Sequence, residues 1–170
     1  MAGPAARRAG FTLIELLVVL VLIGIVTSIA VLSVGSSGEG EVELEARRLG
    51  ALMALASEEA VLRSREMGIA FTAEGYQFLA LGDDNAWVAL NDEVFRPRTL
   101  PAGFSLRLSV DGLPVDIAKP KEKPEPQVFL LSDGERTAFE VDLGVIDGVR
   151  YRITAPVLGD LQVAAAAERP

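Results

Sequence analysis

The chain contains no cysteine and no histidine among its 170 residues. Without cysteine it can form neither a disulfide framework nor a thiolate nucleophile or metal ligand. Without histidine it lacks the commonest general base and the commonest ligand of transition metals. The sequence also has no GxxxxGK phosphate-binding pattern, and the adjacent carboxylates Glu58 and Glu59 point apart on a helix. We therefore expect a protein that is not an enzyme, with no catalytic, metal-binding or cofactor-binding residues and no cofactor.

Positive charge is also scarce. The chain has 16 basic and 24 acidic residues. Leaving out Arg7, Arg8 and Glu15, which precede residue 35, the rest of the chain has 14 basic and 23 acidic residues, a net charge of −9. Nucleic-acid backbones and anionic lipid headgroups both attract clustered lysine and arginine. We therefore expect no nucleic-acid partner.

Charged residues are almost absent from one long segment. Residues 11–34 carry no charge except Glu15. As a helix these 24 residues would extend about 36 Å, enough to cross a hydrocarbon layer of about 30 Å. Arg7 and Arg8 precede the segment, which predicts a cytoplasmic N-terminus and an exported remainder. The sequence thus predicts one transmembrane helix over residues 11–34.

Two ordinary explanations account for only part of this segment. A secretory signal peptide has an apolar region of about 7–15 residues followed by a cleavage site of small residues. Here the apolar region is longer, although "TSIA" and "AVLSVG" offer small residues. An uncleaved signal anchor explains the length and the arginines but not Glu15, because a carboxylate near the centre of a membrane costs about 3 kcal/mol.

A more specific motif begins at Gly10. Gly10 is followed by Phe11, Thr12, Leu13, Ile14 and Glu15 and then by the apolar run, a pattern that resembles the signal of type IV prepilins. The resemblance implies that residues 1–10 are a leader, which a membrane-embedded aspartyl peptidase removes by cutting after Gly10. The same peptidase would N-methylate Phe11. The apolar segment would then be retained as the core helix of a filament.

Cleavage at that position gives Glu15 a role. The new terminal ammonium at Phe11 lies four residues before the Glu15 carboxylate. In a filament, the Phe11 amine of one subunit could pair with Glu15 of a neighbour, and the pairing would fix the axial register of the subunits. Removing one partner of such a buried pair typically costs about 3–5 kcal/mol.

A second helical pattern follows the glycine- and serine-rich "GSSGEGE", where we expect a joint and where Ser36 and Glu39 have the spacing of a capping box. We expect the part of the helix over residues 35–67 to pack on the chain's own sheet rather than on a separate partner, and Gly68 to end it. Its apolar face comprises Leu49, Leu52, Met53, Ala56 and Ala60.

Beyond Gly68 the hydrophobic period becomes two, which is typical of strands. The sequence predicts an α+β fold, with a long N-terminal helix (transmembrane, then amphipathic) packed on an antiparallel β domain over residues 68–170. About eight short strands are expected, at residues 69–72, 76–81, 86–90, 104–110, 128–131, 138–143, 149–154 and 159–163.

The connections between these strands have distinct compositions. Residues 111–127 hold four prolines and all three lysines of the chain, and we expect an exposed, mobile loop there. "LGDDNAW" and "SDGE" are typical of hairpin turns. Asp83, Asp84 and Asn85 could supply oxygen ligands to calcium, but a turn is favoured because such a site needs about six oxygens. The only tryptophan, Trp87, is expected to anchor the core.

Several longer stretches resemble the H family of minor pseudopilins of type II secretion systems. They are "EARRLGALMALASEEAVLRSREMGIAF", "GYQFL" followed by a tryptophan, "RTLPAGFSLRL" and "VFLLSDGERTAFEV". The resemblance implies a non-enzymatic filament subunit in the bacterial inner membrane, with a periplasmic β domain, near the tip of a pseudopilus that assists export of folded proteins. Its implied partners are the major pseudopilin G, the minor pseudopilins I, J and K, and prepilin peptidase, with the secretin as a further candidate.

Two other functional classes remain to be weighed. A minor pilin of a true type IV pilus, in the group that includes DNA-uptake pilins, should carry a basic surface. Here the one lysine cluster, "KPKEKP", is diluted by Glu122 and Glu125. A signal-anchored periplasmic enzyme conflicts with the lack of histidine and cysteine and with the motif at Gly10.

Overall fold

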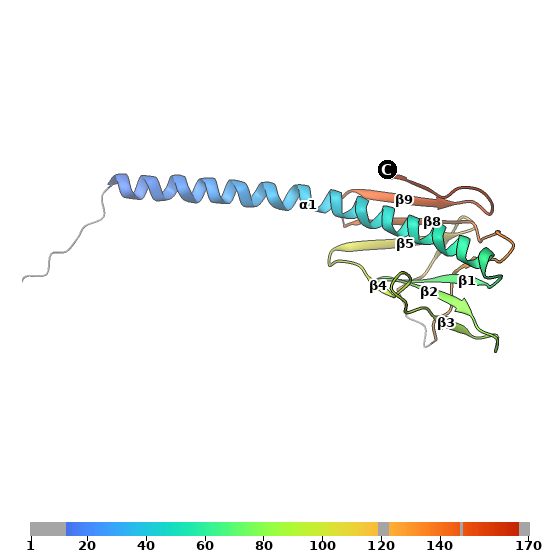
Figure 1. The fold of residues 1–170 in the computed structure, drawn as a ribbon. Helices are drawn as coiled ribbons and strands as arrows, with labels where there is room; N and C mark the ends of the chain where they lie inside the picture. Colours follow the sequence, from blue (N-terminus) through green and yellow to red (C-terminus); the bar gives the residue numbers. More distant parts are fainter. Residues whose placement is uncertain (1–12, 119–122, 147, 167–170) are drawn as a thin grey trace, which may run out of the picture. The chain divides into compact units, whose positions relative to one another are not determined.

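The computed structural model describes residues 13–118, 123–146 and 148–166; within these ranges the side chains of residues 25–38 are not described. The chain forms two compact units, Met1–Gly38 and Glu39–Pro170. One helix, α1 (Leu13–Leu62), contributes to both. The second unit contains the ten described strands (Figure 1). The strands are β1 (Met67–Thr72), β2 (Gly75–Leu81), β3 (Trp87–Ala89), β4 (Arg98–Thr99), β5 (Phe104–Val110), β6 (Leu113–Val115), β7 (Val128–Leu130), β8 (Phe139–Val145), β9 (Arg150–Ala155) and β10 (Gln162–Ala165).

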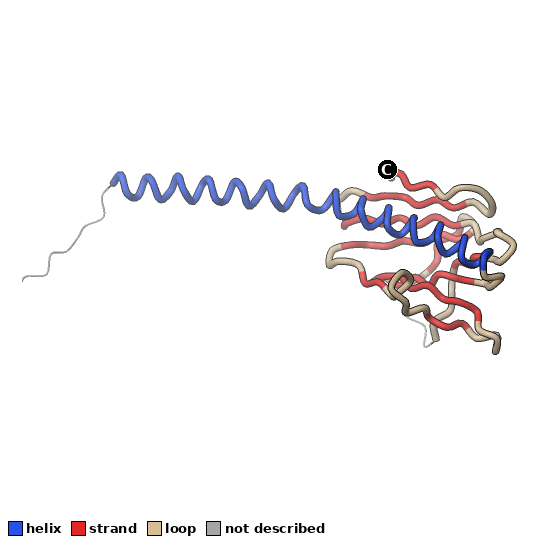
Figure 2. The backbone as a smooth tube through the Cα atoms, in the orientation of Figure 1, coloured by secondary structure: helices blue, strands red, loops and turns tan. Residues whose placement is uncertain are grey.

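The strands form two antiparallel sheets. In sheet A the order is β3-β2-β1-β7, and β4 also pairs with β2. In sheet B the order is β10-β9-β8-β5-β6. Figure 2 shows the domain part of α1 lying across the strands of the second unit. The α+β class predicted from the sequence is confirmed, but the strands number ten rather than eight and they divide between two sheets.

The hydrophobic core lies where α1 meets both sheets. On the helix it includes Ala46, Leu49, Met53, Ala56 and Ala60, each at most 1 % exposed. Their spacing of three or four residues places them on one side of the helix. Sheets A and B contribute most of the remaining core residues, among them Phe71, Phe78, Leu108, Val141 and Ile153. The predicted inward face of α1 is confirmed, and Leu52 packs at its margin.

The helix ends earlier than predicted. Its last residue is Leu62, and Ser64 adopts a left-handed conformation with φ of 48°. The Arg65 N–H donates to the Ala60 carbonyl and the Ser64 N–H donates to the Val61 carbonyl, which is the Schellman arrangement at a helix C-terminus. Ser64 therefore has the role that was predicted for Gly68, which instead lies inside β1.

Helical hydrogen bonding also continues through "GSSGEGE". The predicted capping box at Ser36 and Glu39 is therefore wrong, because no second helix begins there. The boundary between the two units nevertheless falls within this stretch, after Gly38.

Strand β6 occupies part of the predicted loop over residues 111–127. It pairs with β5 so that Leu113 lies opposite Val110. The two residues between them, Asp111 and Gly112, have φ values of 51° and 78°, as a two-residue type I′ hairpin requires. Further along, the Gln127 side chain accepts from the Phe71 N–H at 2.7 Å and donates to the Phe71 carbonyl at 3.2 Å. The two ends of the segment are therefore attached to the sheets.

Candidate assembly surfaces

The predicted assembly residues lie at the start of the chain. Glu15 is in the first turn of α1, where a carboxylate interacts favourably with the helix dipole. Gly10 and Phe11 lie outside the described residues. The proposed cleavage, methylation and amine pairing therefore stay predictions.

The helix around Glu15 exposes apolar side chains on every side. Ten of them, from Leu13 to Ile23, are between 42 % and 84 % exposed. A helix that is apolar all round is normally covered by protein or lipid. In the parts of the chain that the structure describes, no helix combines the length and the hydrophobicity needed to cross a membrane. The predicted span over residues 11–34 includes residues and side chains outside those parts.

A buried carboxylate joins α1 to sheet A. Glu45 is only 9 % exposed. Its Oε1 accepts a hydrogen bond of 2.9 Å from the Tyr76 hydroxyl on β2, and its Oε2 forms an ion pair of 2.6 Å with Arg48. Burial, followed by the nearby Glu45 charge, raises the pKa of Tyr76 above its ordinary value. Tyr76 therefore remains a neutral donor at physiological pH.

A similar contact joins α1 to sheet B. Glu43 accepts from the Tyr151 hydroxyl on β9 at 3.0 Å and from Arg47 at 2.8 Å. The hydrogen bond from Arg47, and then the one from Tyr151, hold the pKa of Glu43 below its ordinary value. Both tyrosines of the chain thus bind glutamates of the same helix, from different sheets.

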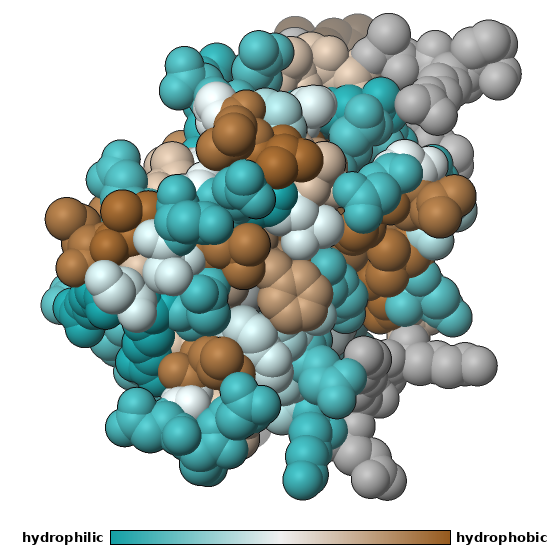
Figure 3. Space-filling view, turned by 90° about the vertical axis from the view of Figure 1, so that its right-hand side faces the viewer, coloured by the Kyte–Doolittle hydropathy of each residue, from teal (hydrophilic) through white to brown (hydrophobic). Residues whose placement is uncertain are grey.

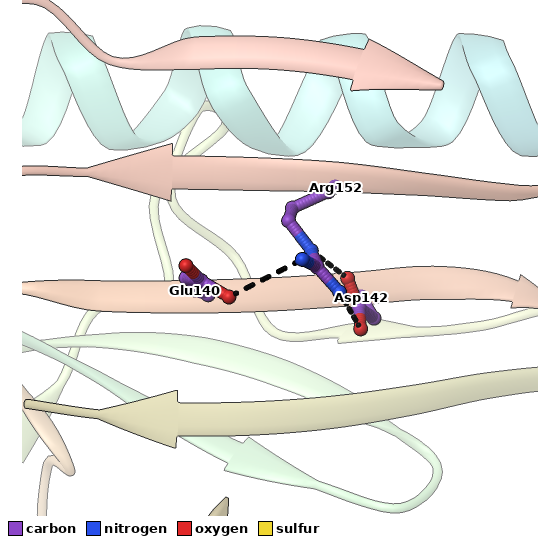
Figure 4. A network of polar contacts seen from close by, with 3 residues as sticks. All are labelled: Glu140, Asp142 and Arg152. Carbon is purple, nitrogen blue, oxygen red and sulfur yellow. Dashed lines mark hydrogen bonds and ion pairs between the residues drawn. The ribbon is translucent and has the colours of Figure 1, made fainter. Parts of the chain in front are cut away.

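The outer face of sheet B carries a charged network (Figure 4). Arg152 on β9 donates from Nε and Nη2 to the Asp142 carboxylate on β8, at 2.6 and 2.8 Å. Its Nη1 lies 3.6 Å from Glu140. The hydrogen bonds to Asp142 raise the pKa of Arg152. Arg107 is exposed and lies opposite Asp142 in the strand register, so arginines border this carboxylate on two strands.

Trp87 does not anchor the core, contrary to the prediction. It is half-buried and packs against Phe129, with ring centroids 5.7 Å apart. The register places Phe129, Gly68, Leu79 and Ala89 in one row across the face of sheet A that points away from α1. Trp87 lies on this face because it is two residues from Ala89 on β3.

The acidic residues at 83 and 84 form a turn, as the sequence predicted. The Gly82 N–H donates to the Ala86 carbonyl at 2.8 Å, and Asn85 has φ of 61°. The Asp84 carboxylate accepts from the Ala86 N–H. The "SDGE" turn is also confirmed, since the Leu131 N–H donates to the Glu135 carbonyl at 2.8 Å.

On the described part of the surface viewed in Figure 3, hydrophobic residues form small patches among hydrophilic ones.

The tyrosine–glutamate contacts and strand β6 were not predicted from the sequence. The contacts join residues 31 and 108 positions apart, so no local pattern indicates them. The signal for β6 was present, because Asp-Gly between apolar residues is a strong hairpin signal.

Comparison with known families identifies two segments. Residues 5–36 match the prokaryotic N-terminal methylation motif, and residues 45–158 match the family described as type II transport protein GspH. The second match covers most of the domain that contains the two sheets.

Individual relatives agree with these matches. The type II secretion system protein H of Pseudomonas aeruginosa is 37 % identical over 143 residues, covering 79 % of this chain and 81 % of that one. The protein of the same name from Aeromonas hydrophila is 31 % identical over 157 residues, covering 85 % and 86 %. The crystal structure of the minor pseudopilin EpsH from the type II secretion system of Vibrio cholerae superposes with a TM-score of 0.66 at 28 % identity, covering 78 % of this chain and 99 % of that one.

Proposed function

The chain belongs to the family of the type II transport protein GspH and is a minor pseudopilin of the type II secretion system, and from this we propose that it acts as a structural subunit near the tip of the periplasmic pseudopilus. The observation that carries the proposal is the agreement between sequence and fold. The family match over residues 45–158 falls on the helix and the two sheets that superpose on EpsH.

We also propose that the chain matures as prepilins do. The N-terminal methylation motif over residues 5–36 contains Gly10, Phe11 and Glu15 in the predicted order. Prepilin peptidase would cut after Gly10, remove residues 1–10 and methylate Phe11. Residues 11–34 would remain as a single inner-membrane helix, with the N-terminus cytoplasmic and the sheets in the periplasm.

Mass spectrometry of the chain purified from peptidase-positive cells tests this maturation. We expect an N-terminal peptide that begins with N-methylated Phe11. A Gly10→Val variant is the matched control and should retain the leader, because a branched side chain occupies the cleavage position. Recovery of wild-type chain starting at Met1 or Ala2 from such cells would contradict the proposal.

The proposed partners are the major pseudopilin G and the minor pseudopilins I, J and K. Support comes from the family membership and from a domain of net charge −9 that offers polar and charged surfaces for reversible contacts. A pull-down with residues 36–170 as bait, against the soluble domains of these four proteins and against single-stranded and duplex DNA, tests it. We expect at least one pseudopilin to bind and DNA not to bind. Capture of DNA alone would instead favour a DNA-uptake pilin.

A further inference from the structure

The last strand of sheet B, β10, pairs with a neighbour on one side only. The order β10-β9-β8-β5-β6 places it at the end of the sheet, and in Figure 1 it is the strand beside β9 that leads to the end marked C. Its ladder with β9 continues one residue beyond the strand, because the Ala166 N–H donates to the Arg150 carbonyl at 2.8 Å. The family match ends at residue 158, so it does not include this strand.

The hydrogen bond from Ala166 determines which backbone groups of β10 point outward. In an antiparallel pair, residues that bond the neighbouring strand alternate with residues whose N–H and C=O point away from it. Gln162, Ala164 and Ala166 therefore bond to β9. Val163 and Ala165 present their N–H and C=O groups at the free edge. No residue in the described part of the chain donates to or accepts from these four groups.

The other strands at the ends of the two sheets are protected against pairing. On β6, Pro114 occupies the outward-facing position of the hairpin and has no N–H. On β7, Thr137 donates its N–H to the Phe129 carbonyl, and its hydroxyl accepts from the Phe129 N–H. Strand β3 has only three residues. Proline, charge, short length and covering segments are the usual means of preventing strand pairing, and the free edge of β10 has no proline, no charged residue and no covering segment among the described residues.

The surface of α1 next to this edge is small and apolar. A Cβ at Gly50 would lie 2.7 Å from Val163 Cγ2, so β10 runs directly beside this part of the helix. Ala54 and Val61 follow Gly50 by four and eleven residues, which places them on the same side of the helix. Ala54 is exposed and Val61 is 45 % exposed. A strand added to β10 would place every second side chain against this surface.

We propose that an extended segment of a neighbouring pseudopilin adds to β10 as a further strand of sheet B. The inference rests on the proposed function, which supplies the neighbouring subunits. The added segment satisfies the N–H and C=O groups of Val163 and Ala165 through main-chain hydrogen bonds. It pairs antiparallel, as every strand pair of this sheet does, and it carries apolar side chains at the alternate positions that face α1.

Pairing of β10 with β10 of a second copy does not fit the proposed function. Two identical strands paired antiparallel are related by a twofold axis, so the α1 helices of the two domains run in opposite directions. Subunits anchored in one membrane must enter it from the same end of this helix. The added segment therefore belongs to a different protein.

Amide hydrogen exchange of the full-length chain in detergent tests the edge directly. In the free chain, the N–H groups of Val163 and Ala165 should exchange at least about tenfold faster than that of Ala164, which bonds to Arg152 on β9. The soluble domains of pseudopilins G, I, J and K are then added in turn. In the complex with the domain that binds, exchange at Val163 and Ala165 should slow by about tenfold or more, while exchange at Ala164 stays unchanged.

Proline substitutions separate the free edge from the ladder with β9. Ala165→Pro removes an outward-facing N–H and should weaken capture of that domain about tenfold without lowering the unfolding temperature. Ala165→Thr keeps the N–H and should bind as the wild type does. Ala164→Pro is the matched control, because it removes an N–H that bonds to β9 and should lower the unfolding temperature.

Three results would overturn the strand addition. They are slow exchange of both outward-facing amides in the free chain, fast exchange of both within a stable complex, and undiminished capture by a folded Ala165→Pro variant. The last two results would leave the proposed partners standing, because a pseudopilin domain still binds. A wild-type chain that captures none of the four domains would contradict the proposed partners together with the strand addition.

Discussion

Glu45 is the residue whose surroundings constrain it most. Its carboxylate is almost inaccessible to water, and its hydrogen-bond and ion-pair partners are Tyr76 and Arg48. A buried charge without partners is strongly destabilising. Glu43, two residues earlier, has the same kinds of partner in Tyr151 and Arg47, but it lies nearer the solvent. The hydrogen bond from Tyr76 to Glu45 should therefore contribute more to the stability of the fold than the hydrogen bond from Tyr151 to Glu43.

Replacing Tyr76 by phenylalanine should destabilise the domain. The change removes the hydroxyl that donates to buried Glu45, and hydrogen bonds to charged groups contribute about 1.5–3 kcal/mol. We expect a loss of that size in the free energy of unfolding, measured by denaturant titration followed through the fluorescence of Trp87. Tyr151→Phe is the matched control and should have a smaller effect, because Glu43 can be hydrated. Equal losses of stability in the two variants would show that the burial of Glu45 does not strengthen its contact with Tyr76.

Tyr76 should also make the stability depend on alkaline pH. Its pKa in the folded chain is raised above the ordinary value of 10.0. The unfolded chain therefore loses this proton first, so the stabilisation is complete below about pH 10 and is lost as pH rises toward the folded-state pKa. We expect stability to fall above about pH 10 more steeply in the wild type than in Tyr76→Phe. Parallel pH profiles of the two proteins would show that Tyr76 is not the group responsible.

At the scale of single residues, the sequence predicted features that depend on neighbouring residues in the chain. Glu15 belongs to a motif of consecutive residues, so the motif could be identified from the sequence, and it lies within the matched N-terminal methylation motif over residues 5–36. The roles of Glu43 and Glu45 depend on tyrosines that meet them only after the chain has folded, so they could not be predicted. Trp87 was misplaced because hydrophobicity predicts burial but not the face of the sheet on which a residue lies.

At the scale of elements, strand β1 depends on close approach by another segment. Pro126 packs over Gly68: a Cβ at Gly68 would lie 2.5 Å from Pro126 Cβ and 3.1 Å from the Val128 carbonyl oxygen. Gly68 is thus required for packing rather than for ending the helix. The chain leading into β7 can lie against sheet A only because this position has no side chain.

Gly68→Ala should therefore destabilise the domain by about 1–3 kcal/mol, the usual cost of overpacking. Gly40→Ala is the matched control, because Gly40 lies in α1 and a Cβ there meets nothing within 4 Å. That change should stabilise the domain by about 0.5–1 kcal/mol through helix propensity. Thermal unfolding of both variants would show opposite shifts. A neutral Gly68→Ala variant would mean that Pro126 can move aside without loss.

Long alternating segments were the easiest elements to predict. Strand β5 was predicted with its bounds correct, because four apolar residues alternate with polar ones along it. The two-residue strand β4 has no such pattern, and its pairing with β2 follows only from the fold. The helix end was misjudged because glycine is the usual residue in the left-handed position, and here serine occupies it.

At the scale of the whole molecule, the division of the strands into two sheets was not predictable from periodicity alone. Alternation identifies a buried face but does not identify which sheet that face belongs to. The family, in contrast, was predictable, because the motif around Glu15 and the stretches that continue into β1 and β5 are specific. The proposed assembly role can be tested at Glu15.

Glu15→Val should leave membrane location intact and weaken incorporation into the pseudopilus. The change removes the carboxylate proposed to pair with the Phe11 amine of a neighbour, and losing one partner of a buried pair costs about 3–5 kcal/mol. Membrane fractionation measures the first property, and cross-linking to the major pseudopilin G in intact cells measures the second. Val18→Ala, a change in the same segment that keeps its charge, serves as the control. Normal incorporation of Glu15→Val would exclude the pairing role.

The two tyrosine contacts have a mechanical consequence. Glu43 and Glu45 lie shortly after Glu39, the residue within α1 at which the second unit begins. A force that draws the helix along its axis out of this unit would have to slide it past both sheets at once. The hydrogen bonds from Tyr76 and Tyr151 would carry that shear first, one on each side. Under load, the domain should yield at this pair of contacts before the sheets separate.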